Sequence, residues 1–306
     1  MSSSEISSFD REYEALKTGR AVVELADWSS ISVTGADRQR FLNSFCTNDV
    51  KRLVPGSSCE AFITNVKGKI VGHGLLHCRD AEMVFFGVPN QAPRLIAHLD
   101  RYIIREDVQL RDTTGERSYL LIAGGVPARK LNASMSWDIV GRGDLKIFEV
   151  DPSHVSDVLR VLLAEGFVVV GPQAFEAVRI EAGMTWYGVD FNEENLPQEV
   201  GRDSQAISFV KGCYLGQETV ARIDALGHVN QLLVAVRFSG RDVPEVGTAL
   251  AREGRTVGSV TSATFSPKLN APIALAMVRR EANSPGTRLM SAIGECEVIV
   301  LPLAQP

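Results

Sequence analysis

The chain has 306 residues, of which 45% are hydrophobic and 23% are charged, so its composition is that of an ordinary globular protein with two or three domains. The formal net charge of −5 at pH 7 provides no overall positive field that would attract nucleic acid. The amino-terminal residues contain no apolar signal-peptide core, and no later segment is apolar over the roughly 20 residues that span a membrane. We therefore expect a cytoplasmic protein that binds neither nucleic acid nor a membrane.

Strands and helices alternate in the first third of the chain. The Ser-rich first eight residues are expected to form a loose tail. Short apolar runs between turn residues predict strands at 31–35, 60–65, 69–78 and 82–88. Apolar residues at helical spacing predict helices at 37–45 and 89–106, the second with Leu95, Leu99, Tyr102 and Ile103 on one face.

A second round of the same kind follows. It predicts a strand at 118–124, a hairpin turning at Gly141–Asp144, and helices at 152–166 and 171–183. Two such rounds indicate two related α+β lobes rather than a doubly wound parallel sheet. From about Gln231 the pattern changes to short strands joined by Gly, Pro and Asn turns, which predicts a small all-β domain, a barrel or a sandwich.

Phosphate-binding and metal-binding motifs are not present. Residues 67–74 contain Gly and Lys but lack the spacing of a phosphate-binding loop and the third glycine of a dinucleotide loop. His73 and His77 would share one face of a strand, and two histidines alone make a poor metal site. The five cysteines are scattered, odd in number and without a C-x-x-C pair, so we expect neither disulfides nor a bound metal.

The segment 211–218 reads KGCYLGQE and places Cys213 just before the helical pattern of GQETVARI. A cysteine at the start of a helix lies near exposed N–H groups that stabilise a thiolate, and Lys211 would add a positive charge. The alternative is a buried, inert residue, because free cysteine is among the most buried residue types and is usually unreactive, and Lys211 could be a solvated lysine. Cys213 and Lys211 are the candidate catalytic residues.

Glu181 is the second candidate for chemistry. In the helix GPQAFEAVRIEAG it lies on one stripe with Ala177 and Ala174, where a ligand could approach closely. The alternative is a surface carboxylate paired with Arg179 or another neighbour. The residues alone leave both interpretations open.

The KGCYLGQETVARI segment resembles the signature of the YgfZ-like branch of the folate-binding superfamily that includes the glycine-cleavage T-protein, an aminomethyltransferase. The resemblance extends over nearly the whole chain and keeps the same order. The other matching blocks are REYEALKTGRAVVEL (11–25), SVTGADRQRFLNSFCTNDVKRLVPG (32–56), RIEAGMTWYGVD (179–190), LPQEVG (196–201) and VGSVTSATFSPKLNAPIALAMV (257–278).

This resemblance implies a tetrahydrofolate-binding protein. It implies a folate-binding core of two ferredoxin-like lobes in residues 1–230 and a small β-barrel in residues 231–306. Glu181 matches the acid that meets the pterin, and a carboxylate suits the adjacent N–H and amino donors of that ring. The matching motifs also supply Asn48, Asp49, Tyr187 and Arg222 as folate-binding candidates.

One departure separates this chain from the T-proteins. They carry an aspartate pair in the strand after their KGG turn, and one aspartate supports aminomethyl transfer. This chain has Gly72 and His73 there, so no carboxylate is placed to assist the reacting centre.

Three functions follow, from different classes. The favoured one, implied by the YgfZ-like resemblance, is an accessory protein for iron–sulfur cluster assembly or repair, whose partners are iron–sulfur enzymes or cluster-assembly proteins and whose motif cysteine takes part. The alternative is a folate-dependent aminomethyl or other one-carbon transferase. The third is a thiol-redox protein that uses Cys213, which the absence of a nearby resolving cysteine disfavours.

Overall fold

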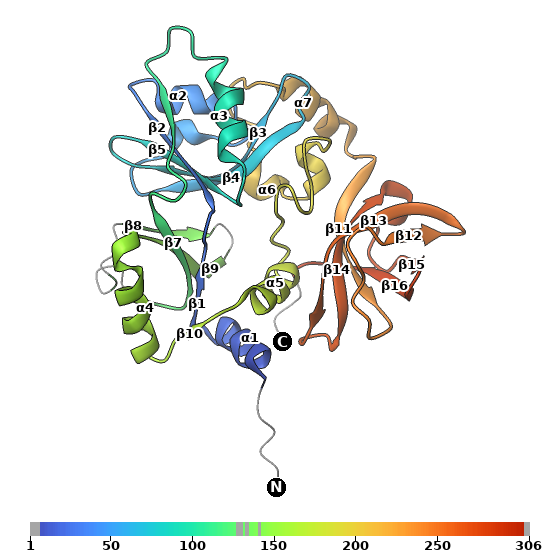
Figure 1. Ribbon diagram of the computed structural model, residues 1–306. Coiled ribbons are helices and arrows are strands. Elements are labelled where there is room, and N and C mark those ends of the chain that lie inside the picture. Colours follow the sequence, from blue (N-terminus) through green and yellow to red (C-terminus); the bar gives the residue numbers. More distant parts are fainter. Residues whose placement is uncertain (1–6, 127–130, 132–134, 140–141, 303–306) are drawn as a thin grey trace. The chain divides into compact units, whose positions relative to one another are not determined.

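The computed structural model of the chain describes residues 7–126, 131, 135–139 and 142–302 (Figure 1). The chain divides into two compact units. The first unit consists of Met1–Ala61 and Gly74–Phe175, and the second of Phe62–His73 and Glu176–Pro306. The short segment 62–73 therefore belongs with the carboxy-terminal half of the chain.

The described part of residues 21–169 contains two five-stranded sheets, with strand orders β3-β4-β5-β2-β6 and β10-β1-β7-β9-β8. The first sheet has the strands β2 (Ser29–Thr34), β3 (Ser58–Thr64), β4 (Ile70–Cys78), β5 (Met83–Gly87) and β6 (Gln109–Asp112). The second has β1 (Ala21–Glu24), β7 (Ser118–Ala123), β8 (Met135–Ile139), β9 (Arg142–Val150) and β10 (Val168–Val169). The helices among them are α1 (Ser8–Thr18), α2 (Arg38–Asn43), α3 (Ala92–Asp100), α4 (Val155–Ala164) and α5 (Pro172–Glu181).

Helix α4 covers the second sheet. Its Val158 and Leu162 pack with Val22 of β1, Ile122 of β7 and Phe148 of β9 in one buried cluster. This is the amphipathic face that apolar residues at i and i+4 produce, and its burial holds helix and sheet together.

Strand β2 has two faces of different chemistry, because side chains alternate along a strand. Ile31 and Val33 are buried apolar residues, while Ser30 and Ser32, which alternate with them, are buried polar residues. The strand pairs antiparallel with β5 on one side and β6 on the other. Its buried hydroxyls require hydrogen-bond partners, which Tyr119 provides for Ser30 and Glu82 for Ser32.

The second unit contains α6 (Asp203–Ala206), α7 (Gln217–Leu226) and a closed barrel with the strand order β11-β14-β13-β12-β15-β16. The barrel strands are β11 (Gln231–Phe238), β12 (Ala249–Arg252), β13 (Arg255–Ser266), β14 (Ala271–Arg279), β15 (Arg288–Ser291) and β16 (Gly294–Ile299), coloured orange to red in Figure 1. Val236, Phe238, Leu250, Ala274 and Val298 belong to the apolar core of the barrel.

The expected α+β class with two lobes and a carboxy-terminal all-β barrel is confirmed. The barrel strands begin at Gln231, and the division into a core of residues 1–230 and a domain of residues 231–306 stays a prediction.

Several element boundaries differ from the prediction. The helix expected at 89–106 ends at Asp100, so Tyr102 and Ile103 lie beyond it. Strand β9 begins at Arg142, within the turn expected at Gly141–Asp144, and residues 140–141 lie outside the described part of the chain. Within the expected loose tail, residues 1–6 also lie outside it, but Ser7 caps α1 by accepting a hydrogen bond from the Asp10 N–H at 3.1 Å.

Candidate functional site

The Cys213 loop precedes α7. Cys213 is exposed, whereas Cys46, Cys78 and Cys296 are buried. Helix α7 begins at Gln217, so the cysteine lies four residues before the first helical residue, as the prediction of a position just before a helix requires. An exposed thiol can reach a partner or a reagent without any unfolding of the loop.

Gly216 fixes the geometry between this loop and α7. It has φ +83°, and a Cβ built on it would lie 2.3 Å from the Asn65 carbonyl oxygen and under 3 Å from the Gly68 backbone. Any side chain at this position would therefore collide with the turn at residues 65–69. The Thr64 hydroxyl adds a hydrogen bond of 2.7 Å to the Leu215 carbonyl. The second glycine of KGCYLGQE thus locks the loop against the 62–73 segment.

Lys211 is not the solvated lysine that the sequence left as an alternative. Its side chain is buried, with 8% of the residue exposed, and Nζ lies 5.1 Å from the centre of the Tyr214 ring. A cation over an aromatic face is held by the quadrupole of the ring. Lys211 and Tyr214 therefore form the inner side of the loop, and Cys213 forms its outer side.

Glu181 is buried at the end of α5, with 4% of the residue exposed. The Ser266 hydroxyl of strand β13 donates a hydrogen bond of 2.5 Å to its Oε1 atom. Ala174 and Ala177, which share its stripe, are fully buried. The alternative of a surface carboxylate is therefore wrong.

Arg179 also has other partners than the sequence suggested. It is fully buried and binds Glu176 one turn earlier through Nε at 2.7 Å. Its Nη1 donates to the Met184 carbonyl at 2.8 Å and to Asp190 Oδ2 at 2.7 Å. Its guanidinium lies 4.3 Å from the centre of the Trp186 ring. Burial acts to lower its pKa, but the bonds and charges of the two carboxylates raise the pKa above its usual value.

An aromatic cluster surrounds His73. The His73 ring stacks on Phe62 with ring centres 4.6 Å apart and meets the edge of Phe191 at 5.4 Å. Phe191 in turn contacts Tyr187 at 5.8 Å. The structure therefore brings the folate-binding candidate Tyr187 and His73 into one cluster.

The remaining predicted folate-binding residues lie in different parts of the chain. Asn48 and Asp49 belong to the first unit, in the loop before the short 3-10 helix Val50–Arg52. The Asn48 amide donates to the Glu60 carbonyl at 2.8 Å, and Asp49 forms an ion pair of 3.1 Å with the exposed Arg52. Arg222 lies exposed on α7 in the second unit.

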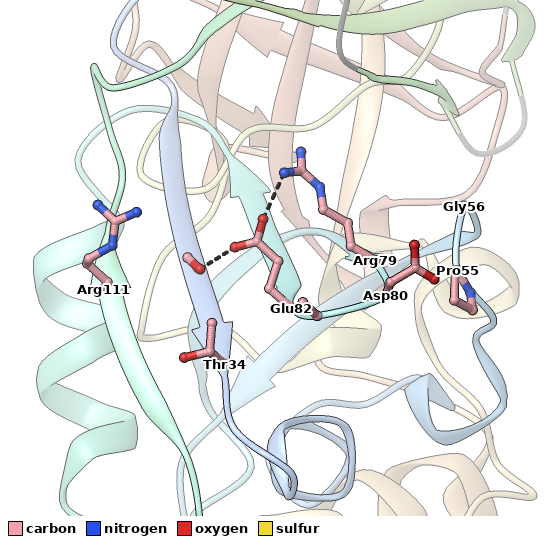
Figure 2. Close-up of a pocket in the computed structure, with 9 residues that line it drawn as sticks. Thr34, Pro55, Gly56, Arg79, Asp80, Glu82 and Arg111 are labelled. Atoms are coloured by element: carbon pink, nitrogen blue, oxygen red, sulfur yellow. Dashed lines mark hydrogen bonds and ion pairs between the residues drawn. The ribbon is translucent and has the colours of Figure 1, made fainter.

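A cavity of about 560 Å³ lies in the first unit, and none of the predicted site residues lines it. It is lined by Ser32, Thr34, Pro55, Gly56, Arg79, Asp80, Ala81, Glu82 and Arg111 (Figure 2). Arg111 binds Glu116, which does not line the cavity, at 2.5 Å, and the lining residues Arg79 and Glu82 bind each other at 2.8 Å. Three of the four charged side chains that line the cavity therefore take part in ion pairs.

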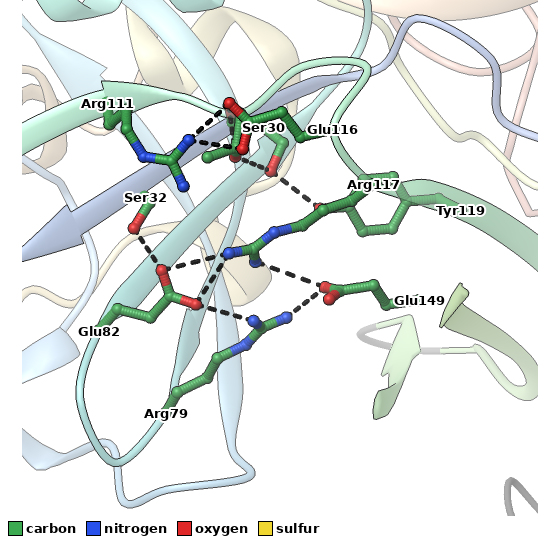
Figure 3. Close-up of polar contacts among 10 residues, drawn as sticks. Ser30, Ser32, Arg79, Glu82, Arg111, Glu116, Arg117, Tyr119 and Glu149 are labelled. Atoms are coloured by element: carbon green, nitrogen blue, oxygen red, sulfur yellow. Dashed lines mark hydrogen bonds and ion pairs between the residues drawn. The ribbon is translucent and has the colours of Figure 1, made fainter. Parts of the chain in front are cut away.

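Arg79 and Glu82 of the cavity lining form, with Arg117 and Glu149, a network of four charged residues that sequence analysis missed (Figure 3). Glu82 binds both Arg79, at 2.8 Å, and Arg117, at 3.1 Å, and Glu149 binds the same two arginines. Ser32 also donates to Glu82. Burial acts to raise the pKa of Glu82, but the Ser32 hydroxyl and the two guanidinium groups more than offset it and lower the pKa.

No group of three or more His, Cys, Asp or Glu side chains within the described ranges could hold a metal ion. Of the helices in that part of the chain, none has the length and apolar character needed to cross a membrane.

Comparison with known proteins identifies the family. The GCVT N-terminal domain matches residues 3–169, and the glycine cleavage T-protein C-terminal barrel domain matches residues 232–304. The chain is 24% identical to an aminomethyltransferase of Rippkaea orientalis, over 97% of this chain and 89% of the relative. It is 28% identical to an aminomethyltransferase of Rubrobacter xylanophilus, over 88% and 79%. A putative chloroplastic transferase of Arabidopsis thaliana is 26% identical, over 95% and 72%.

The fold agrees with these matches. The crystal structure of glycine cleavage system aminomethyltransferase T from Bartonella henselae superposes with a TM-score of 0.82 at 19% identity, over 95% of this chain and 89% of that one. Two αβ lobes with a carboxy-terminal barrel thus define the T-protein class of fold. The chain belongs to the glycine cleavage T-protein family.

Proposed function

We propose that this chain binds tetrahydrofolate and that Glu181 accepts hydrogen bonds from the pterin ring. The observation that carries the proposal is the burial of this carboxylate at the end of α5, with 4% of the residue exposed. A buried carboxylate is retained where hydrogen-bond donors meet it, and a pterin presents an N–H and an amino group side by side. Tetrahydrofolate is the one-carbon carrier of the aminomethyltransferases to which the chain is similar.

Folate-dependent one-carbon transfer is the activity that the family favours, because the relatives compared above carry the name aminomethyltransferase or transferase. When bound, tetrahydrofolate supplies the acceptor nitrogens for the carbon. The resemblance implies that Gly72 and His73 stand where the T-proteins carry their aspartate pair. The His73 ring stacks on Phe62 and meets the edge of Phe191, and these contacts hold the imidazole in a fixed orientation. An oriented imidazole can accept and donate a proton. We propose that His73, rather than a carboxylate, serves the reacting centre.

A second candidate function rests on the exposed Cys213. Its loop is locked at Gly216 and presents the thiol to solvent. This arrangement supports a YgfZ-like accessory role toward iron–sulfur enzymes or cluster-assembly proteins, in which the thiol meets the partner. Lys211 then supports the loop from inside through its contact with Tyr214. Asn48, Asp49, Tyr187 and Arg222 are proposed to contribute to folate binding in either function.

Calorimetric titration with tetrahydrofolate tests the shared part of the proposal. Glu181→Gln should weaken binding by about 1–3 kcal/mol, which is about 5- to 150-fold, because the buried donors of the pterin lose their charged acceptor. Glu245→Gln, at an exposed glutamate of the barrel, is the matched control and should bind as the wild type does. Equal affinities of the Glu181→Gln variant and the wild type would remove Glu181 from the site.

Two activity measurements separate the candidate functions. Formation of methylene-tetrahydrofolate from an aminomethyl-loaded carrier protein, lost in His73→Ala and retained in Cys213→Ser, would establish the transferase. Restoration of iron–sulfur enzyme activities in depleted cells by the wild type, and not by Cys213→Ser, would establish the accessory role. A Cys213→Ser variant that complements fully would exclude the thiol from that role.

A further inference from the structure

Strand β13 of the barrel provides three hydroxyl side chains to segments outside the barrel. Thr261 and Ser262 both bind Asp190 Oδ1, the first at 3.2 Å. Ser266, four residues further along the strand, donates to Glu181 Oε1 at 2.5 Å. One strand of the barrel therefore holds two carboxylates of the RIEAGMTWYGVD segment at two separate points.

The hydroxyl of Ser266 has a defined direction. Its oxygen accepts a hydrogen bond of 3.1 Å from the Leu269 backbone N–H, and the residue is fully buried. Because Ser266 Oγ already accepts from this N–H, its own proton is directed to the second neighbour, the Glu181 carboxylate. A short bond from a neutral hydroxyl to a carboxylate restrains the rotation of that carboxylate.

We propose that Ser266 is a positioning residue for the pterin site: it holds Oε1 of Glu181 and so sets the plane in which this carboxylate meets the pterin donors. The barrel is then part of the recognition of the folate head group. This inference rests on the proposed binding of folate at Glu181. Adjacent donors of a planar ring are bound well only by a carboxylate that lies in the plane of the ring, so the orientation of the acid decides the selectivity.

Ser262 provides a matched control on the same strand. It is also a buried serine whose hydroxyl binds a carboxylate, but that carboxylate is Asp190, which is bound to Arg179 and to the Trp186 N–H. Ser262→Ala removes a hydroxyl of the same kind from the same barrel strand without touching Glu181. Its effect on the melting temperature estimates what a buried serine of β13 contributes to folding alone.

The test is a set of calorimetric titrations with tetrahydrofolate and with an analogue that lacks the 2-amino group. Ser266→Ala should weaken tetrahydrofolate binding about tenfold, in line with a hydrogen bond to a charged group. The same change should alter the affinity for the analogue less than about twofold, because only one of the two adjacent donors remains and the plane of the carboxylate then matters less. Ser262→Ala should leave both affinities within about twofold of the wild type.

A double-mutant cycle gives the second readout. In a Glu181→Gln background, Ser266→Ala should cause no further loss of tetrahydrofolate affinity, since Ser266 acts only through that carboxylate. Ser266→Cys, which keeps the size of the side chain with a weaker donor, should bind with intermediate affinity and serves if the alanine variant does not fold.

The outcomes separate this inference from the proposed function. If the wild type binds tetrahydrofolate and Ser266→Ala binds it equally well, the positioning role is overturned while folate binding stands. If Ser266→Ala weakens tetrahydrofolate and the analogue to the same extent, Ser266 is only a structural residue and the inference is again overturned. If the wild type does not bind tetrahydrofolate, both proposals fall together.

Discussion

Replacing Glu82 by glutamine removes one of the two carboxylates that Arg79 and Arg117 share in the first unit (Figure 3). The guanidinium groups would then depend on Glu149 alone. The four side chains are between 9% and 17% exposed, so water screens them only in part. The glutamine amide can still accept one hydrogen bond, but its NH₂ group would face a cation.

The magnitude follows from the geometry. At about 4 Å and an effective dielectric constant of about 20, each opposite pair contributes roughly 4 kcal/mol of attraction. Desolvation of the charges offsets much of this, but removal of one partner leaves the other charges buried and costs about 3–5 kcal/mol. Allowing for the residual exposure, we expect Glu82→Gln to lower the free energy of unfolding by about 3 kcal/mol at pH 7, which is a fall in melting temperature of roughly 6–12 °C.

The pH dependence has a fixed sign. The pKa of Glu82 is lowered in the folded chain, so the stability that its charge provides is fully present above the unfolded pKa near 4.5 and is lost as the pH falls through the lower folded pKa. The difference between wild type and Glu82→Gln should therefore be constant from pH 5 to 8 and shrink below pH 4.5. At pH 5 to 8 the variant has the lower melting temperature.

Differential scanning calorimetry of both proteins measures this effect. The matched control is Glu116→Gln, because Glu116 binds Arg111 at 2.5 Å but both partners are more than half exposed. An exposed pair of this kind contributes about 0–1 kcal/mol, so the control should melt within a few degrees of the wild type. If Glu82→Gln melts as the control does, the network behaves as a solvated surface pair and the reasoning from its burial is refuted.

Three further outcomes are expected. Burial, and after it the charge of Asp224, raises the pKa of Asp203 to about 6, so its carboxylate destabilises the fold above pH 6. Asp203→Asn should therefore raise the free energy of unfolding by about 1–2 kcal/mol at pH 8 and leave it unchanged at pH 4, as measured by calorimetry. Burial lowers the pKa of His77 to about 4, so the free energy of unfolding of the wild type should fall by roughly 3 kcal/mol as the pH is lowered from 6.5 to below 4. A His77→Gln variant with the same acid dependence would contradict this. Iodoacetamide followed by peptide mass spectrometry should modify Cys213 first, and equal modification of the buried cysteines would show that the loop is not the accessible one.

Local pattern was sufficient for the elements that bury one face. The spacing of Val158 and Leu162 predicts α4, and the alternation of apolar residues after Gln231 predicts the barrel strands. It was not sufficient for β1, whose four residues pair antiparallel with β7 about 100 residues later and parallel with β10 further on. A short strand gains its stability from such distant partners, and no local pattern records them.

The candidate site shows the same limit. Cys213 could be placed before a helix because the loop and α7 are neighbours in the sequence. The burial of Lys211 could not be predicted, since it depends on the folded loop, in which Nζ lies over the Tyr214 ring. Gly216 is visible in the sequence as a glycine of the motif. The need for a glycine there arises from the turn at Asn65, about 150 residues earlier, which leaves no room for a side chain.

Helix geometry could have separated Arg179 from Glu181 in advance. Residues two apart on a helix point to different sides, while residues three apart are neighbours. Arg179 accordingly binds Glu176, and its other acidic partner, Asp190, comes from the loop after the helix. Glu181 is left on the side of the alanine stripe, and its partner Ser266 comes from a strand that follows 85 residues later. The acid that the sequence singled out was therefore correct in its place on the helix, but its orientation is a property of the barrel. A chain that ended before β13 would keep the helix and its carboxylate and would lose the hydrogen bond that orients it.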